Sequence, residues 1–208
     1  MHKLKLYGTP LSGHVHRVAL LLSMLELPYE FIESPAEVRQ SEAFRRLNPL
    51  GQIPVLVDGD LTLADSNAIL VYLAKNYAPG SHWLPETPLA ATQVQAWLSK
   101  AAGEVRYGPA SCRLIAQFSA PEDDRVALAI SARFLPQMEQ HLSDRDYLAT
   151  EQPTIADLAC FSYVAVAPEG GISLAPYPAI RRWVARIAAL PGFFAMPALP
   201  HPTQRYIL

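Results

Sequence analysis

The sequence has 208 residues, of which 50% are hydrophobic and 17% are charged. This length suits one large domain or two small ones, and so many hydrophobic residues exclude a fully disordered chain. The 17 lysine and arginine residues against 19 aspartate and glutamate residues give a net charge of −2. Because no basic excess is present to neutralise phosphates, nucleic acid is not an expected partner.

The two cysteines, Cys112 and Cys160, are too few for a disulfide framework and lack partners at the spacing of a zinc site. A bridge between them is the disfavoured alternative. The chain begins with a strand pattern instead of the long apolar segment of a secretory signal, and its apolar runs are shorter than the roughly 18–20 residues that span a bilayer. We therefore expect a cytoplasmic protein without a metal ion and without a membrane partner.

The first third of the chain predicts strands and helices in alternation. Residues 4–7 alternate between apolar and polar and stop at a Gly-Thr-Pro sequence, which is typical of a short strand. Apolar residues then recur every three or four positions over 15–25, which predicts a helix, and 29–32 predicts a second strand. A strand–helix–strand unit favours a parallel pair.

The following segment, residues 33–46, is polar and charged, with one helical turn expected over 42–47. Residues 53–57 and 61–63 are mostly apolar and flank an Asp-Gly-Asp sequence. This pattern predicts a hairpin, because its tight turn needs positive φ. Helical spacing resumes at residue 68, after three residues of the capping type.

A proline-rich stretch before residue 88 is the best candidate for a linker, and apolar periodicity beyond it predicts only helices. The Gly-Pro pair at 108–109 is expected to kink or break the first of them, because proline lacks an N–H donor and clashes with the preceding turn. The predicted helices cover 94–105, 126–142, 155–165 and 180–190.

Thr154 to Asp157 has the spacing of a capping box for the helix over 155–165. On this basis, replacing Asp157 with alanine should lower the free energy of unfolding by about 1 kcal/mol. The expected organisation is an α+β domain over residues 1–78, a linker over 79–88 and an all-α domain over 89–208.

Four motifs together resemble the cytosolic glutathione S-transferase family. The first places a serine five residues after a tyrosine and an arginine in the following helix, as in the serine-type phi and theta classes. The second is close to N-P-x-G-x-[IV]-P-x-L, the third matches L-x-[ED]-S-x-A-I, and the fourth is the capping segment above. They occupy Tyr7–Val18, Asn48–Leu56, Leu63–Ile69 and Pro153–Asp157. The resemblance, to bacterial phi/theta-like members, implies a thioredoxin-like βαβ-ββα domain followed by an all-helical domain.

The resemblance also implies an enzyme that activates its co-substrate glutathione as a thiolate for attack on small hydrophobic electrophiles, with hydroperoxide reduction as a further activity. A homodimer is implied as well. Two alternatives stay open: a non-catalytic protein that binds glutathione or another ligand on the same fold, and a glutathione-dependent isomerase or dehalogenase. A thioltransferase is disfavoured, because no cysteine stands at the start of the first helix.

Ser12 is the predicted catalytic residue. A thiol with a pKa near 8.5 is mostly protonated at neutral pH, and lowering this pKa by about two units requires roughly 2.7 kcal/mol. A charge-assisted hydrogen bond of about 1.5–3 kcal/mol and a helix-dipole contribution of about 0.3–1 kcal/mol suffice together. Ser12 at a helix start can supply both, and the alternative is a plain helix cap.

Three neighbours compete with Ser12. Other classes of the family use a tyrosine at the strand position of Tyr7, but the spacing here favours a structural role for it. His14 and His16 are expected at the surface beside the helix start, with contact to the sulfur as the alternative.

Further residues are expected to hold glutathione itself. Proline alone readily permits a cis peptide, and a cis bond before Pro54 would turn the Ile53 main chain outward to pair with a peptide; a trans proline at a strand start is the alternative. An aspartate and a serine at a helix start suit an ammonium and a carboxylate, unless they only cap the helix. The binding residues that the resemblance implies are Arg39, Gln40, Gln52, Ile53, Pro54, Asp65 and Ser66, with Arg39 or Gln40 at the glycine carboxylate.

The electrophile is expected to bind between loops of the first domain and the first helix of the second. The predicted pocket residues are Leu11, Tyr107, Ser111 and Arg113, with Arg106 as a further candidate. The proline-rich segment at 197–202 is expected either to cover this pocket or to be loose.

Overall fold

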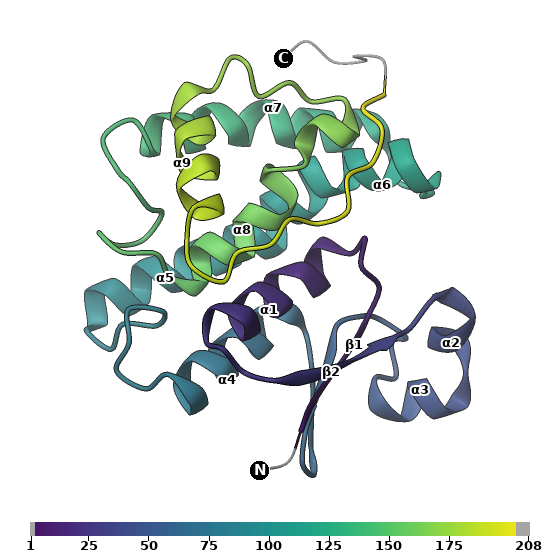
Figure 1. Ribbon diagram of the computed structural model, residues 1–208. Coiled ribbons are helices and arrows are strands. Elements are labelled where there is room, and N and C mark those ends of the chain that lie inside the picture. Colours follow the sequence, from purple (N-terminus) through teal and green to yellow (C-terminus); the bar gives the residue numbers. More distant parts are fainter. Residues whose placement is uncertain (1–2, 203–208) are drawn as a thin grey trace.

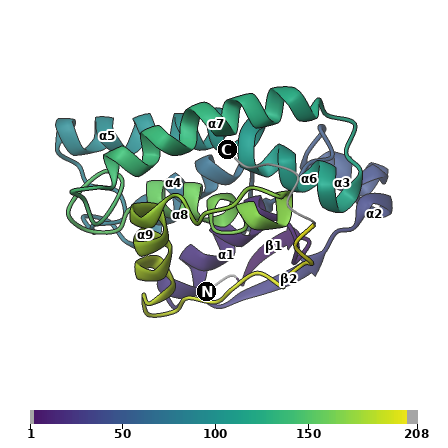
Figure 2. The same cartoon turned by 90° about the horizontal axis from the view of Figure 1, so that it is seen from above.

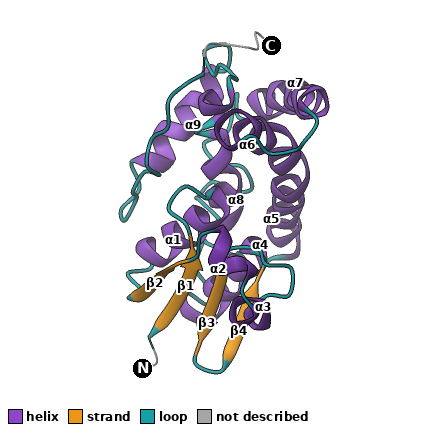
Figure 3. Ribbon diagram, turned by 90° about the vertical axis from the view of Figure 1, so that its right-hand side faces the viewer, coloured by secondary structure: helices purple, strands orange, loops and turns teal. Residues whose placement is uncertain are grey.

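The computed structural model describes residues 3–202 of the chain. A sheet with flanking helices forms one layer, and a larger group of helices forms a second layer against it (Figures 1 and 3). This is the arrangement that the sequence predicts: within residues 3–202, all four strands lie before residue 65, and the elements after it are helices.

The sheet has four strands in the order β2-β1-β3-β4. β1 and β2 are parallel, with Leu6 opposite Phe31, whereas β3 is antiparallel to both β1 and β4. The predicted parallel pair and the predicted hairpin are confirmed, and Gly59 in the hairpin turn has φ +58°. The strands are β1 (Leu4–Gly8), β2 (Tyr29–Glu33), β3 (Val55–Asp58) and β4 (Leu61–Ala64).

Helices α1 (Gly13–Met24) and α4 (Ser66–Tyr77) lie between the sheet and the helical layer (Figure 3). Their buried faces are aliphatic, with Leu20 to Leu22 on α1 and Leu70 and Leu73 on α4 all fully buried. Two short helices connect β2 to β3: α2 (Ala36–Gln40), which the sequence pattern does not predict, and α3 (Glu42–Leu47), which it does.

The helical layer surrounds α8, all of whose residues are buried and which packs against both α1 and α5. This explains why the segment is apolar on every side instead of along one stripe. Figure 2 shows α7 running across the top of the view, and α7 packs against η1, the continuation of α5. The elements are α5 (Pro88–Lys100), the π-helix η1 (Ala101–Ala110), α6 (Ser111–Phe118), α7 (Asp124–His141), α8 (Ile155–Val164), the 3-10 helix η2 (Ala167–Gly170) and α9 (Pro178–Ala188).

Pro109 does not break the helical path. α5, η1 and α6 follow one another without a gap, and Pro109 lies inside the π-helical segment. The expectation of a break is wrong for a physical reason. A π-helix shifts the hydrogen-bond register to i→i+5, which widens the turn at the point where proline lacks its N–H and its ring needs space.

The predicted capping box at the start of α8 is confirmed. Thr154 Oγ1 accepts from the Ala156 N–H at 3.2 Å, and Asp157 Oδ2 accepts from the Thr154 N–H at 2.8 Å. Cys112 and Cys160 are both free and buried. Within residues 3–202, no helix is both long enough and apolar enough to cross a membrane.

Candidate active site

Ser12 stands in the turn that leads from β1 into α1. Its N–H donates to the Thr9 carbonyl at 3.1 Å, and its Oγ accepts from the Val15 N–H at 3.4 Å, so Ser12 caps α1. The side chain is half-buried. Because the cap uses a lone pair of Oγ, the hydroxyl proton stays free for donation to an anion. The two interpretations of Ser12, helix cap and hydrogen-bond donor, are therefore compatible.

The residue after Ser12 has to be glycine. A Cβ at Gly13 would lie 2.8 Å from ring atoms of Tyr163 on α8, which is too close for any side chain. The absence of a side chain lets the start of α1 pack directly on α8. The Ser12 turn consequently lies where the sheet layer and the helical layer meet.

The start of α4 is built on a strained backbone. Asp65 has φ +74° and ψ 119°, a conformation that residues other than glycine rarely adopt. Its carboxylate accepts from the N–H groups of Asn67 and Ala68, both at 2.9 Å. Both bonds end on Oδ1 and the side chain is exposed, so Oδ2 is available to a cation.

Arg17 connects the start of α4 to α1. Its Nη1 donates to Ser66 Oγ at 3.2 Å and to the Asn67 side-chain oxygen at 3.0 Å, and Arg17 is only 1% exposed. Among residues 3–202, its Nε and Nη2 have no hydrogen-bond partner. Burial lowers the pKa of Arg17, although a guanidinium keeps its charge in proteins. This buried charge and the positive ends of two helices make the site electropositive and suit it to anions.

Ser66 is buried between Arg17 and His14. Because its Oγ accepts from Arg17, its own proton points elsewhere, and His14 Nδ1 lies 3.4 Å away. The His14 ring packs edge-on against Tyr163, with centroids 5.0 Å apart. Burial, followed by the charges of Arg17 and Arg106, holds the pKa of His14 well below its usual value of 6.5. A neutral imidazole therefore faces the start of α4 at neutral pH.

His16 faces away from the start of α4. Its Nδ1 lies 3.0 Å from Ser162 Oγ, its Nε2 lies 2.9 Å from the Phe194 carbonyl oxygen, and burial lowers its pKa. A neutral ring with its proton on Nε2 satisfies both partners. The expectation of surface histidines is wrong: His16 is buried and His14 half-buried. The reason is that α8 and residues 189–202, the C-terminal segment, cover this face of α1.

Tyr7, the rival to Ser12, lies on β1. Its half-buried ring meets the ring of Phe44 on α3 edge to face, with centroids 6.2 Å apart. This contact attaches α3 to the sheet, which fits the structural role expected for Tyr7.

The loop before β3 is held by Asn48. Its side-chain nitrogen donates to the Gln52 carbonyl at 2.8 Å, and its side-chain oxygen accepts from the Leu50 N–H at 3.2 Å. The Ile53–Pro54 peptide bond is cis, as expected. The Gln52 side chain is exposed, and Ile53 is half-buried.

Arg39 and Gln40 form the end of α2. A Cβ at Gly51 would lie 3.2 Å from the Arg39 carbonyl oxygen, so this end of α2 lies beside the loop that carries Gln52. Arg39 is half-buried, and its Nε has no hydrogen-bond partner among residues 3–202, whereas Gln40 is exposed. That Arg39 or Gln40 binds the glycine carboxylate of glutathione stays a prediction.

Two predicted pocket residues are buried inside the helical layer. Ser111 is 2% exposed and hydrogen-bonds to Glu122 and to Arg106 Nη1, the latter at 3.0 Å. Arg113 is 1% exposed and forms an ion pair with Glu169 at 2.5 Å. Ser111 Oγ and two nitrogens of Arg113, Nε and Nη1, have partners inside the protein, whereas Arg113 Nη2 has none among residues 3–202. Because both side chains are buried, neither lines a surface open to a ligand. Helical periodicity did not predict this burial, because the partners Arg106, Glu122 and Glu169 lie outside α6.

Leu11 and Tyr107 keep accessible surface. Tyr107 is 56% exposed and lies beneath the Arg106 guanidinium, 5.1 Å from its ring centroid. Arg106 also pairs with Glu122 at 3.0 Å, and this bond lowers the pKa of Glu122. Leu11 is half-buried in the turn before Ser12.

Two family models match the chain in order. The glutathione S-transferase N-terminal domain matches residues 6–82, and the glutathione S-transferase C-terminal domain matches residues 100–191. The chain belongs to the glutathione S-transferase family. The expected family, its thioredoxin-like and helical fold, and the expected enzyme class are confirmed.

Individual glutathione S-transferases are similar along nearly their whole length. Glutathione S-transferase 3 of Zea mays is 34% identical, with 98% of this chain and 99% of the relative covered. The crystal structure of a glutathione S-transferase from Xanthobacter autotrophicus Py2 is 36% identical with a TM-score of 0.86, covering 94% and 97% of the two chains. A glutathione transferase homologue from Drosophila mojavensis, solved with bound glutathione, is 27% identical with a TM-score of 0.82, covering 92% and 90%.

Three residues of this glutathione S-transferase contact predicted site residues or the turn at Ser12 but were not themselves predicted: Arg17, Tyr163 and Glu169. Arg17 gives a detectable signal, since it places a charge inside the apolar run over 15–22. Tyr163 gives a weaker one, because its helix is apolar on all sides. Glu169 gives none, because its partner Arg113 is distant in sequence.

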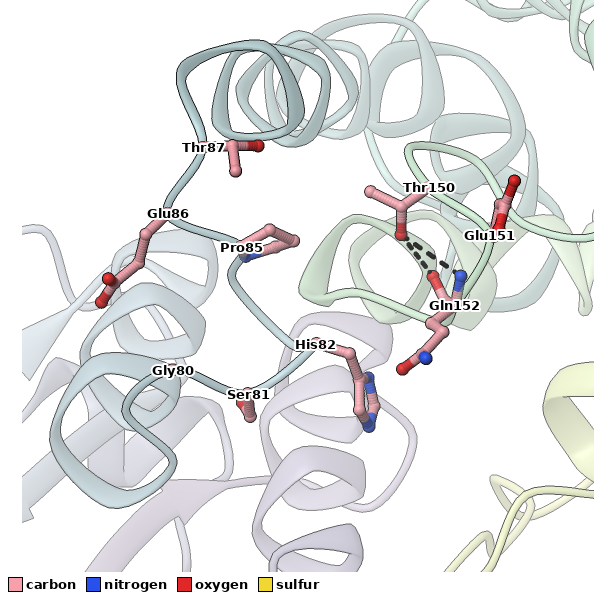
Figure 4. A pocket seen from close by; sticks show the side chains of 9 residues that line it. All are labelled: Gly80, Ser81, His82, Pro85, Glu86, Thr87, Thr150, Glu151 and Gln152. Carbon is pink, nitrogen blue, oxygen red and sulfur yellow. Dashed lines mark hydrogen bonds between the residues drawn. The ribbon is translucent and has the colours of Figure 1, made fainter.

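A hollow of about 520 Å³ lies elsewhere, between residues 80–87 and the loop before α8 (Figure 4). His82 Nδ1 lies 2.6 Å from the Pro153 carbonyl oxygen, and Thr150 closes its own loop through two bonds to the Gln152 backbone. The lining includes none of the predicted site residues. Within residues 3–202, no group of three or more His, Cys, Asp or Glu residues is placed to hold a metal ion, and the expectation of no metal stays a prediction.

Proposed function

We propose that this glutathione S-transferase binds glutathione between the starts of α1 and α4, lowers the pKa of its thiol so that the proton is lost to solvent, and transfers the glutathionyl group to a small hydrophobic electrophile. The thiolate sulfur forms a bond to an electrophilic carbon of the acceptor. In a substitution, the bond from that carbon to the leaving group breaks and the leaving group keeps the electron pair. In an addition, the acceptor takes up a proton from solvent.

The observation that carries the proposal is the free hydroxyl proton of Ser12 at the positive end of α1. The cap bond from Val15 fixes Oγ without consuming that proton. A hydroxyl donor of about 1.5–3 kcal/mol and the helix end together reach the roughly 2.7 kcal/mol that a shift of two pKa units requires. The buried charge of Arg17 favours an anion in the same region.

The γ-glutamyl end of glutathione carries an ammonium and a carboxylate, and the start of α4 offers a partner for each. The exposed Oδ2 of Asp65 suits the ammonium. Ser66 accepts from Arg17, so its proton can turn from His14 toward the ligand carboxylate. Arg17 thus orients the Ser66 hydroxyl as a donor instead of meeting the ligand itself.

The other end of the tripeptide is assigned by family resemblance. The main chain of Ile53 beside Pro54 would meet the cysteinyl part, and Gln52 would bind next to it. Arg39 or Gln40 would hold the glycine carboxylate at the end of α2. The location of α2 beside Gly51 supports this assignment.

The electrophile would bind against Leu11 and Tyr107, the two predicted pocket residues that keep accessible surface. The protein would act as a homodimer in the cytoplasm. The two free thiols, both in the described part of the chain, fit a reducing compartment.

The deciding experiment is an ultraviolet titration of the thiol of glutathione bound to wild type, Ser12→Ala and Ser12→Thr. Wild type should lower the thiol pKa, and Ser12→Ala should raise it again by about 1–2 units. Ser12→Thr should keep most of the shift, because threonine keeps the hydroxyl and also caps helices. Turnover of a chromogenic aryl halide should follow the same order.

Two results would overturn the proposal. A bound thiol with the pKa of free glutathione would indicate a binding protein without catalysis. Full turnover in Ser12→Ala together with lost turnover in Tyr7→Phe would transfer the role of Ser12 to Tyr7. Ser143→Ala is the matched control, because this exposed serine lies outside the site.

A further inference from the structure

The peptide group between Leu11 and Ser12 is held at both of its polar atoms. The Ser12 N–H donates to the Thr9 carbonyl at 3.1 Å within the turn. The Leu11 carbonyl accepts from Arg113 Nη1 at 2.9 Å, and Arg113 belongs to α6 in the helical layer. Two bonds from opposite sides fix the plane of this peptide. The plane sets the φ angle of Ser12, and with it the direction in which the serine side chain leaves the backbone.

Arg113 is in turn held by Glu169. Its Nε donates to Glu169 Oε2 at 2.5 Å, and the two side chains are 1% and 5% exposed. The backbones are also in close contact, since a Cβ at Gly170 would lie 2.7 Å from the Arg113 backbone nitrogen. A glycine at 170 therefore allows η2 to approach α6 closely enough for the ion pair to form. The Arg113 guanidinium therefore binds Glu169 through Nε and the Leu11 carbonyl, in the turn before Ser12, through Nη1.

The C-terminal segment reaches the same carboxylate. Leu199 N–H donates to Glu169 Oε1 at 3.1 Å, and Gln117 Nε2 donates to the carbonyls of Glu169 and Pro200 at 2.7 and 2.8 Å. Figure 1 shows this segment crossing the helical layer from α9 toward α6. Of the two alternatives for residues 197–202, a loose segment is wrong as far as Pro200, because Leu199 and Pro200 are held at Glu169 and Gln117; whether the segment covers the electrophile pocket stays a prediction.

We propose that Arg113 is a positioning residue for Ser12. From the helical layer, its guanidinium fixes the orientation of the Leu11–Ser12 peptide through the bond to the Leu11 carbonyl. Glu169, which the C-terminal segment holds through the Leu199 N–H, fixes the position of that guanidinium. The inference rests on the proposed function, because the Ser12 hydroxyl is what it positions. Arg113 is only 1% exposed and offers almost no surface to a substrate, so we expect its effect in the thiol pKa and not in the affinity for glutathione.

Lysine is the informative replacement for Arg113. It keeps the charge opposite Glu169, but its single ammonium lacks the planar fork that reaches two partners in fixed directions. In Arg113→Lys, we expect the thiol pKa of bound glutathione to rise by about 0.5–1 unit. The KM for glutathione should stay within about twofold, because the proposed binding groups at Asp65, Ser66 and Ile53 are untouched. Arg145→Lys is the matched control, since Arg145 pairs with Asp144 at the surface.

A double-mutant cycle with Ser12→Ala separates positioning from general support of the fold. If Arg113 acts through Ser12, Arg113→Lys should shift the thiol pKa by less than about 0.3 unit once Ser12 is alanine. Equal shifts in both backgrounds, or a change in KM alone, would overturn the inference. Circular dichroism and thermal melting show whether each variant folds. Should Arg113→Lys not fold, Glu169→Gln carries the same cycle, because the amide keeps the volume of the carboxylate.

The same titration distinguishes the two proposals. A wild-type thiol pKa equal to that of free glutathione would reject the proposed function and the inference together. A lowered wild-type pKa that both Arg113→Lys and Glu169→Gln leave unchanged would reject the inference alone.

Discussion

Helices α4 and α8 each have an aspartate carboxylate that binds backbone N–H groups at or near the helix start, the N-cap Asp65 in α4 and the first-turn Asp157 in α8, but the two environments are opposite. Asp157 at the start of α8 is fully buried, and each of its oxygens accepts two hydrogen bonds. Asp65 at the start of α4 is exposed, sits on a strained backbone, and accepts both of its bonds on Oδ1. One carboxylate is saturated by the protein, whereas the other keeps an oxygen for a partner from outside.

Burial and backbone strain distinguish a capping residue that serves stability from one that serves binding. A buried carboxylate needs a donor for each lone pair, because an unsatisfied charge inside a protein is very unfavourable. An exposed cap needs no such saturation, so strain at φ +74°, a conformation that costs on the order of 1–3 kcal/mol, calls for another explanation. Strain of this size is retained at ligand sites, which matches the role proposed for Asp65.

The greatest loss of stability is expected from a change to the buried carboxylate of Asp157. Asp157→Ala should lower the free energy of unfolding by at least about 3 kcal/mol, more than the roughly 1 kcal/mol of a lost helix cap. The reason is that the change strands buried donors from three residues: Leu148, Thr154 and Trp183. Chemical denaturation monitored by tryptophan fluorescence measures the loss. A loss of only about 1 kcal/mol would mean that water replaces the carboxylate and that burial adds nothing to the cap.

The second prediction concerns the exposed carboxylate. Asp65→Asn should raise the KM for glutathione about tenfold, because the amide cannot pair as a charge with the γ-glutamyl ammonium. The melting temperature should hardly change, since asparagine caps helices as well as aspartate does and tolerates positive φ. Asp65→Ala is the companion variant that loses both functions. A lower melting temperature with an unchanged KM in Asp65→Asn would show that Asp65 only caps α4 and does not bind glutathione. Asp65 and Asp157 would then both serve stability alone.

Local signals predicted the four strands, most of the helices and the capping groups, but not the short helices α2 and α6. The Asp-Gly hairpin, the capping box at Thr154 and the cap at Ser12 each depend on a few consecutive residues, so the sequence alone is enough to find them. The same is true of the apolar pattern that makes α8 a buried helix. Of the two outcomes expected at Pro109, a kink or a break, the break is wrong, because the shift to a π-helix has no comparably simple sequence pattern.

Long-range partners account for what the sequence could not predict. From the sequence, the polar side chains of Ser111 and Arg113 were expected to face a ligand pocket. In the structure they are buried and paired with Glu122 and Glu169. The same holds for Arg17, whose contacts with Ser66 and Asn67 join two helices far apart in the chain. A pairing across 50 or so residues depends on how the layers pack, and no local pattern encodes it.

The smallest expected effect comes from a third aspartate cap, which tests whether the comparison is general. Asp123 begins α7, is exposed like Asp65, and accepts from the N–H groups of Arg125 and Val126 at 2.9 and 3.4 Å. Its φ of −82° is unstrained. Asp123→Ala should therefore lower the free energy of unfolding by only about 1 kcal/mol and leave the KM for glutathione unchanged. A loss as large as that of Asp157→Ala would show that burial does not set the strength of these caps. A raised KM would show that exposed caps affect glutathione binding without lying in the site, and the strained backbone of Asp65 would then no longer mark a binding residue.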